Sequence, residues 1–78
     1  MPEIRQKSIE QYFQDYQIGD PDLKVKILPE VTRIIYDRNI CVAQYEKEED
    51  EYKKKQIEAD YRELGQKIDE IFQGFLKK

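Results

Sequence analysis

Hydrophobic residues in the C-terminal part of the chain recur at helical spacing. They follow one another at intervals of four, three, four, three and four positions: Ile57, Tyr61, Leu64, Ile68, Ile71 and Phe75. Residues three and four positions apart lie on one face of an α-helix, so these side chains form a single stripe. Phe72 and Leu76 widen the stripe at its far end, and charged residues and Gln surround it. The pattern predicts an amphipathic helix.

A second helical stripe lies near the N-terminus. Its members occupy positions i, i+3, i+4 and i+7: Ile9, Tyr12, Phe13 and Tyr16. This spacing predicts a helix over about residues 3–17. Gly19 follows it, and a residue with left-handed backbone geometry commonly ends a helix at such a position. We therefore expect the first helix to end just before Gly19.

Three consecutive residues carry the signals of a second helix start. Asp20 can act as the N-cap, Pro21 suits the first helical position, and Asp22 places negative charge in the first turn. Together they predict a helix that begins at residue 21.

The apolar residues that follow fit two secondary structures. A helical stripe, interrupted only by Arg38, contains Leu23, Ile27, Leu28, Val31, Ile34, Ile35, Cys41, Val42 and Tyr45. It leaves four apolar residues off its face: Val25, Tyr36, Ile40 and Ala43. The many β-branched residues instead suit a β-hairpin with strands at 31–36 and 40–45, although its turn lacks the Gly that favours tight hairpins. We favour the helix and keep the hairpin as the alternative.

Two residues are expected to interrupt this middle helix. Pro29 lacks a backbone N–H and its ring clashes with the preceding turn, so we expect it to kink this element or to divide a short first helix from a longer second one. Asn39 tolerates left-handed geometry and is the expected position of a break. The middle helix is therefore predicted over about residues 21–38.

The C-terminal helix is predicted over residues 47–76, with a start as early as residue 40. Acidic residues precede basic ones by four positions in five pairs: Glu49–Lys53, Asp50–Lys54, Glu51–Lys55, Glu58–Arg62 and Glu63–Lys67. A helix from residue 47 would be on the order of 45 Å long. Such a helix would be longer than a compact chain of this size, so we expect part of it to project or to lie along a partner. Gly65 and Gly74, beside the stripe, indicate close contact with another backbone.

These elements predict an all-α fold with three helices in one small domain, residues 1–78. The alternative is an α+β fold in which the hairpin lies between the N- and C-terminal helices. A chain of this size buries only about 60% of the surface that its unfolded form exposes. With one cysteine and no histidine, neither an internal disulfide nor a histidine metal site can reinforce it. We therefore expect reinforcement by another chain, its own or a foreign one.

Charge and composition exclude several classes of partner. The chain has 17 acidic and 14 basic residues, a net charge of −3, which disfavours general binding to nucleic acid. No apolar run approaches the roughly 18 residues that a membrane span needs, and the first residues lack the apolar core of a signal peptide. The single Cys41 agrees with a reducing compartment, so we expect a cytoplasmic protein.

The sequence offers little for catalysis. There is no histidine, and neither Ser8 nor Thr32 has a recognisable activating partner. Cys41 lies between Ile40 and Val42, as a buried and unreactive thiol would. The acids at residues 46–51 wrap around the helix instead of converging on a cation. We expect no enzyme activity, no cofactor and no metal.

The leading hypothesis is a non-enzymatic helical module for protein–protein interaction. It would act as a regulator, inhibitor or assembly factor that masks or bridges a partner through a helix face, and it would also self-associate. The candidate contact residues are Tyr45, Tyr52, Tyr61, Leu64, Ile68, Ile71, Phe72 and Phe75. The alternative is a small dimeric nucleic-acid-binding transcriptional regulator with basic groups along one side: Lys24, Lys26, Arg33 and Arg38.

Overall fold

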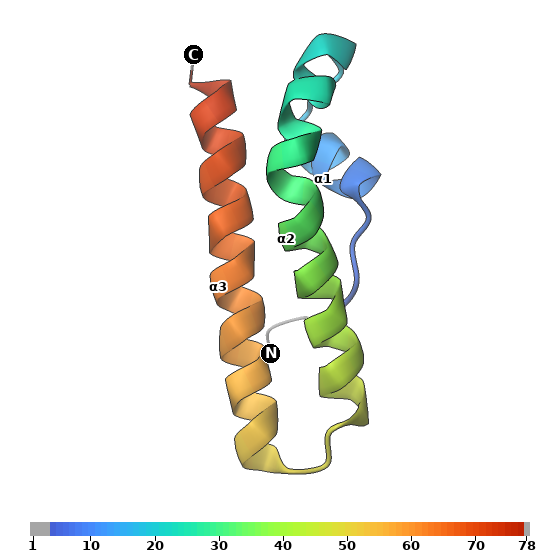
Figure 1. The fold of residues 1–78 in the computed structure, drawn as a ribbon, viewed down its shortest axis with the longest axis vertical. Helices are drawn as coiled ribbons and strands as arrows, with labels where there is room; N and C mark the ends of the chain where they lie inside the picture. The colour runs from blue at the N-terminus through green and yellow to red at the C-terminus, as the bar shows by residue number, and fades with distance from the viewer. Residues whose placement is uncertain (1–3, 78) are drawn as a thin grey trace.

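The computed structural model describes residues 4–77, and this part of the chain forms three α-helices (Figure 1). They are α1 (Ile9–Asp15), α2 (Pro21–Lys47) and α3 (Glu51–Leu76). The two long helices lie side by side and antiparallel, and α1 packs beside the N-terminal half of α2. No strand occurs among the described residues. The predicted all-α, three-helix fold is confirmed, and the alternative hairpin at 31–36 and 40–45 is wrong.

The β-branched middle segment is helical because one of its faces is buried. Ile27, Val31, Ile35 and Val42 are all buried and follow one another at intervals of four, four and seven residues. These intervals keep the side chains on one side of a helix, whereas a strand would place successive residues on opposite faces. Burial of this face therefore outweighs the β propensity of the individual residues.

Neither expected interruption ends α2. Pro29 is exposed on the solvent side, where water can replace the missing donor to the Val25 carbonyl, and the helix continues through it. Asn39 also remains helical, so the predicted break there is wrong. Its side-chain oxygen accepts from the Lys7 amide at 3.0 Å, and its amide donates to the Lys7 carbonyl at 2.9 Å. Asn39 thus fixes the N-terminal segment to α2.

The chain turns back at residues 48–50, not at Asn39. The Glu48 side chain accepts from the Asp50 amide at 3.2 Å, and the Asp50 side chain caps α3 by accepting from the Tyr52 amide at 2.9 Å. The predicted helix of 47–76 therefore begins at Glu51. Because the turn reverses the chain, α3 lies along α2 instead of projecting, within a molecule of 43 × 22 × 18 Å.

The helix α1 is shorter than the predicted range of residues 3–17. It starts at Ile9 because Ser8 and Gln11 form a capping box, in which each side chain accepts from the backbone amide of the other residue. The residues before Ser8 are not helical where the structure describes them.

The left-handed residue that follows α1 is Gln17, not Gly19. Gln17 has φ 57°, and the Ile18 amide donates to the Phe13 carbonyl at 2.8 Å. This bond is the long closing bond of a Schellman motif, and the buried Ile18 side chain supplies the apolar contact that usually accompanies it. Ile18 joins the core although it belongs to no helical stripe.

An aromatic cluster holds α1 against α3. The Phe72 side chain is fully buried. Its ring stacks on the rings of Tyr16 and Tyr12, whose centres lie 4.3 and 6.2 Å from its own. It meets the Phe13 ring edge-on, with the ring centres 6.0 Å apart. The Tyr16 hydroxyl donates to the Asp69 carboxylate at 2.5 Å. Burial raises the pKa of Tyr16, and this hydrogen bond raises the pKa further, so the hydroxyl stays a donor.

Candidate interaction surface

Three of the predicted contact residues belong to the core of the chain itself. Tyr61, Ile68 and Phe72 are buried, the last two completely. They face α1 and α2 and are not part of an exposed surface. The C-terminal stripe thus supplies the inner side of the helix pair, and we withdraw these three residues from the candidate interface.

The other predicted contact residues differ in exposure. Leu64, Ile71, Phe75 and Tyr45 are half-buried. The Lys54 ammonium lies 5.5 Å from the centre of the Tyr45 ring, at the turn between α2 and α3. Tyr52 is 69% exposed, but the next residues on its side of the helix are Lys55 and Gln56. Tyr52 is therefore an isolated aromatic residue among polar ones.

A group of apolar residues lies instead on the solvent side of α2, interrupted by the exposed Thr32 and Arg33. We call it the outer face of α2, and it consists of Val25, Pro29, Tyr36, Ile40 and Ala43. Val25 is 67% exposed, Tyr36 61% and Ile40 37%, and Pro29 is also exposed. These are three of the five large hydrophobic residues that are exposed in the described chain. Most of the exposed large apolar surface therefore belongs to one helix face.

The sequence already contained the signal for this face. Four of its residues are those that the predicted stripe left off its face, and their separations of 11, four and three positions are themselves helical. A helix with apolar residues on both its inner and outer sides has more apolar surface than its own chain covers. Apart from Tyr45, the predicted contact residues lie on α3, because its stripe is the more regular one in the sequence.

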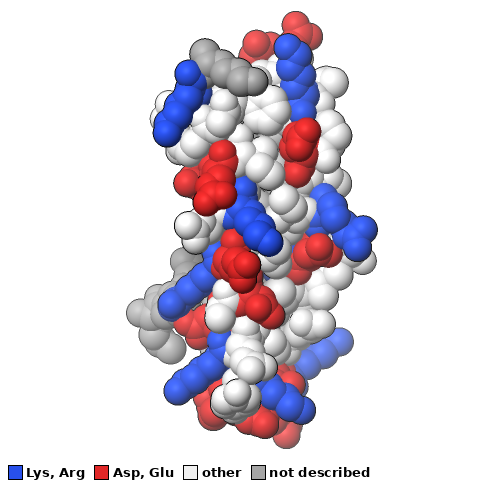
Figure 2. Space-filling model, turned by 60° about the vertical axis from the view of Figure 1, so that its left-hand side comes forward, with Lys and Arg blue, Asp and Glu red and all other residues white. Residues whose placement is uncertain are grey.

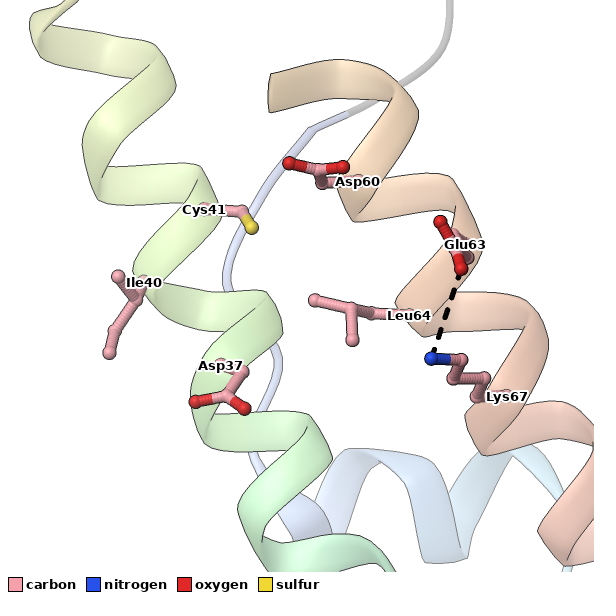
Figure 3. Close-up of a pocket in the computed structure, with 7 residues that line it drawn as sticks. All are labelled: Asp37, Ile40, Cys41, Asp60, Glu63, Leu64 and Lys67. Atoms are coloured by element: carbon pink, nitrogen blue, oxygen red, sulfur yellow. Dashed lines mark ion pairs between the residues drawn. The ribbon is translucent and has the colours of Figure 1, made fainter. Parts of the chain in front are cut away.

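A shallow groove of about 330 Å³ separates α2 from α3 beside Ile40. Figure 3 shows Leu64 reaching from α3 toward α2, whereas Ile40 points away from α3. Lys67 pairs with Glu63 at 3.8 Å along the edge of the groove. Ile40 therefore presents its side chain to the outer face rather than to the inside of the helix pair.

Cys41 lines the same groove but has no feature of a reactive thiol. Burial raises its pKa, and the nearby carboxylates of Asp60 and Asp37 raise the pKa further, while Arg38 lowers it. A raised pKa keeps the thiol protonated at neutral pH, and the thiolate is the nucleophilic form. Cys41 is thus a packing residue in this groove.

Arg38 connects the three helices from the inner side of α2. Its Nε donates to the Tyr61 carbonyl and its Nη1 to the Tyr12 hydroxyl, both at 2.9 Å. The guanidinium lies 3.8 Å from the centre of the Tyr61 ring. A Cβ atom on Gly65 would lie only 2.3 Å from Nη2, so Gly65 makes room for Arg38 and not for another backbone. Gly74, by contrast, has open space around it.

The basic residues of the nucleic-acid hypothesis do not share one face. Lys26 and Arg33 are exposed on α2, but Lys24 lies 5.4 Å from the Phe13 ring centre and Arg38 points inward. Figure 2 shows acidic and basic side chains interspersed along the face that it presents. Phosphate binding depends on concentrated positive charge, so this arrangement does not favour the nucleic-acid hypothesis.

Two further kinds of feature are absent from the part of the chain that the structure describes. No group of three or more His, Cys, Asp or Glu side chains is placed to hold a metal ion. None of the helices has the length and apolar character required to cross a membrane. Comparison of the chain with models of protein families, with curated proteins and with solved structures finds no match.

Proposed function

We propose that this chain is a non-enzymatic protein–protein interaction module that binds through the outer face of α2. It would act as a regulator, inhibitor or assembly factor by masking or bridging a partner surface. The observation that carries the proposal is the exposure of Tyr36 on the same side of α2 as Pro29, Ile40 and Ala43. Tyrosine is among the residue types that contribute most of the binding energy in many interfaces.

The outer face also has the form that groove-binding helices use. Such helices place apolar anchors at intervals of three, four and seven residues along one side. Pro29, Tyr36 and Ala43 follow one another at intervals of seven, and Ile40 lies between the last two. Because the inner side of α2 is already occupied by α1 and α3, binding through the outer face leaves the core intact.

A photo-crosslinking amino acid at position 36 tests this proposal in the native cell. Light should join the variant at position 36 to one protein of discrete mass, because this position lies within the contact. The matched control carries the same group at Tyr52, which is also a highly exposed tyrosine but lies among polar residues. The absence of an adduct at position 36, or equal adducts at both positions, would contradict the proposal.

A further inference from the structure

We infer that the occupant of the outer face of α2 is a second copy of this chain, packed antiparallel across a two-fold axis. This inference rests on the proposed function and names its partner. It is carried by the charges at the two ends of the outer face, together with the spacing of the apolar residues between them.

The spacing suits a long contact between two helices. Asp22, Pro29, Tyr36 and Ala43 are separated by seven residues each, and Val25, Ile40 and Lys47 lie between or beyond them on the same side. A repeat of seven residues keeps one seam of a helix directed at a partner helix over its whole length. From Asp22 to Lys47 the seam is about 37 Å long at 1.5 Å per residue.

The end charges select the direction of the second helix. Asp22 lies in the first turn of α2 and Lys47 in its last turn, and both are exposed. An antiparallel copy brings Asp22 of each chain to Lys47 of the other, which makes two attractive contacts. A parallel copy would place Asp22 against Asp22 and Lys47 against Lys47. Like charges placed opposite one another are unfavourable, so the antiparallel arrangement is preferred.

The same register gives favourable contacts nearer the axis. It places Pro29 opposite Ile40 of the second copy, and Arg33 opposite Tyr36 of the second copy. Arg33 already extends to Asp37 at 3.3 Å with its side chain mostly exposed. From there its guanidinium can reach a tyrosine ring on the second copy, and an arginine over such a ring is attracted to its face. Thus Arg33 and Tyr36 lie at the centre of the seam, apolar residues flank them, and the ends of the seam are charged.

Sedimentation equilibrium of the purified full chain, at low salt and over a range of concentrations, tests the inference. Wild-type chain should dimerise, and Tyr36→Ser should weaken the dimer by at least about tenfold, as the loss of a hot-spot residue does. Tyr52→Ser is the matched control and should leave the dissociation constant unchanged. Both residues are exposed, and far-UV circular dichroism verifies that each variant is folded. A chain that remains monomeric at the highest concentration would overturn the inference.

Charge exchange between the ends tests the antiparallel register. Asp22→Lys alone gives each chain two basic ends, and Lys47→Asp alone gives each chain two acidic ends. Each single variant should therefore dimerise more weakly than wild type. The double variant Asp22→Lys/Lys47→Asp should recover the wild-type dissociation constant, because each basic end then meets an acidic end of an antiparallel copy, whereas a parallel copy would still place like charges together. Altered helix ends would weaken the single variants and would not be corrected by the second exchange, so failure of the double variant to recover would overturn the register.

The two proposals fail in different ways. An adduct from position 36 with the mass of two chains supports the second copy. An adduct with any other mass overturns the second copy while the proposed function stands. The absence of an adduct from position 36 contradicts the proposed function itself, whatever the purified chain does in the centrifuge.

Discussion

At the scale of single residues, Arg38 connects α2 to both other helices. Its guanidinium hydrogen bonds to a residue of α1 and a residue of α3, and it lies over the Tyr61 ring. These contacts fill the space where Gly65 has no side chain. Hydrogen bonds from a charged donor stabilise more than neutral ones do, so the position of Arg38 should be sensitive to small changes around it.

Substitutions at the two glycines of α3 measure how much the position of Arg38 contributes to stability. Gly65→Ala should lower the free energy of unfolding, because the new methyl group displaces the Arg38 guanidinium and disturbs its hydrogen bonds. That loss, on the order of 2 kcal/mol, exceeds the gain of about 1 kcal/mol from replacing a helical glycine by alanine. Gly74→Ala meets nothing within 4 Å and should raise the free energy of unfolding by about 1 kcal/mol. Urea denaturation of the two variants gives both values.

The sign of the change in unfolding free energy for Gly65→Ala shows whether the Arg38 guanidinium is held in place. If both variants were stabilised equally, Arg38 would move aside at no cost, and it could not be the residue that joins the helices. An Arg38→Lys variant gives an independent measurement, since a lysine cannot make the same pair of directed bonds.

At the scale of elements, the sequence predicted the helical faces but not where the helices end. The faces follow from spacings of three and four residues, which are visible along the chain. The turn at 48–50 contains no Gly or Pro, and its Asp50 was read as the partner of Lys54 in a helix. In the structure Asp50 is the N-cap of α3. Of the predicted pairs, Glu58–Arg62 and Glu63–Lys67 are confirmed as ion pairs.

Asn39 and the C-terminal stripe show why other assignments failed. Asn39 stays helical because its side chain bonds to Lys7, 32 residues away, and no local pattern reveals such a partner. The periodicity of α3 likewise showed that Ile68 faces something apolar. It could not show that this surface is the α1–α2 side of the same chain. Long-range contacts therefore decide both helix continuity and which apolar faces stay exposed.

The cap at Asp50 can be tested against its neighbour in the same turn. Asp50→Ala should lower the free energy of unfolding by about 1 kcal/mol, because the Tyr52 amide then loses its acceptor. Glu49→Ala is the control, since Glu49 is exposed in this turn and caps neither helix. Thermal unfolding followed by circular dichroism compares the two variants with wild type. Equal stability of the two would mean that Asp50 does not set the start of α3.

At the scale of the whole molecule, one aromatic cluster packs the α1 segment against α3. Phe72 touches three rings of the α1 segment and is fully buried. For 78 residues, the typical stability per residue gives a total of about 4–12 kcal/mol. One large side chain can therefore supply a substantial part of the stability of the fold.

Phe72→Ala should accordingly destabilise all three helices together. Removing a buried phenylalanine costs about 3–5 kcal/mol, because contacts are lost and a cavity remains. Phe75→Ala, one turn along and only half-buried, should cost clearly less. Urea denaturation should show one transition at a lower midpoint for Phe72→Ala, whether followed by far-UV circular dichroism or by tyrosine fluorescence. Two separate transitions would instead mean that α2 and α3 form a stable pair without α1. In that case the aromatic cluster would hold only the N-terminal segment, and α1 could detach while the outer face of α2 remained available for binding.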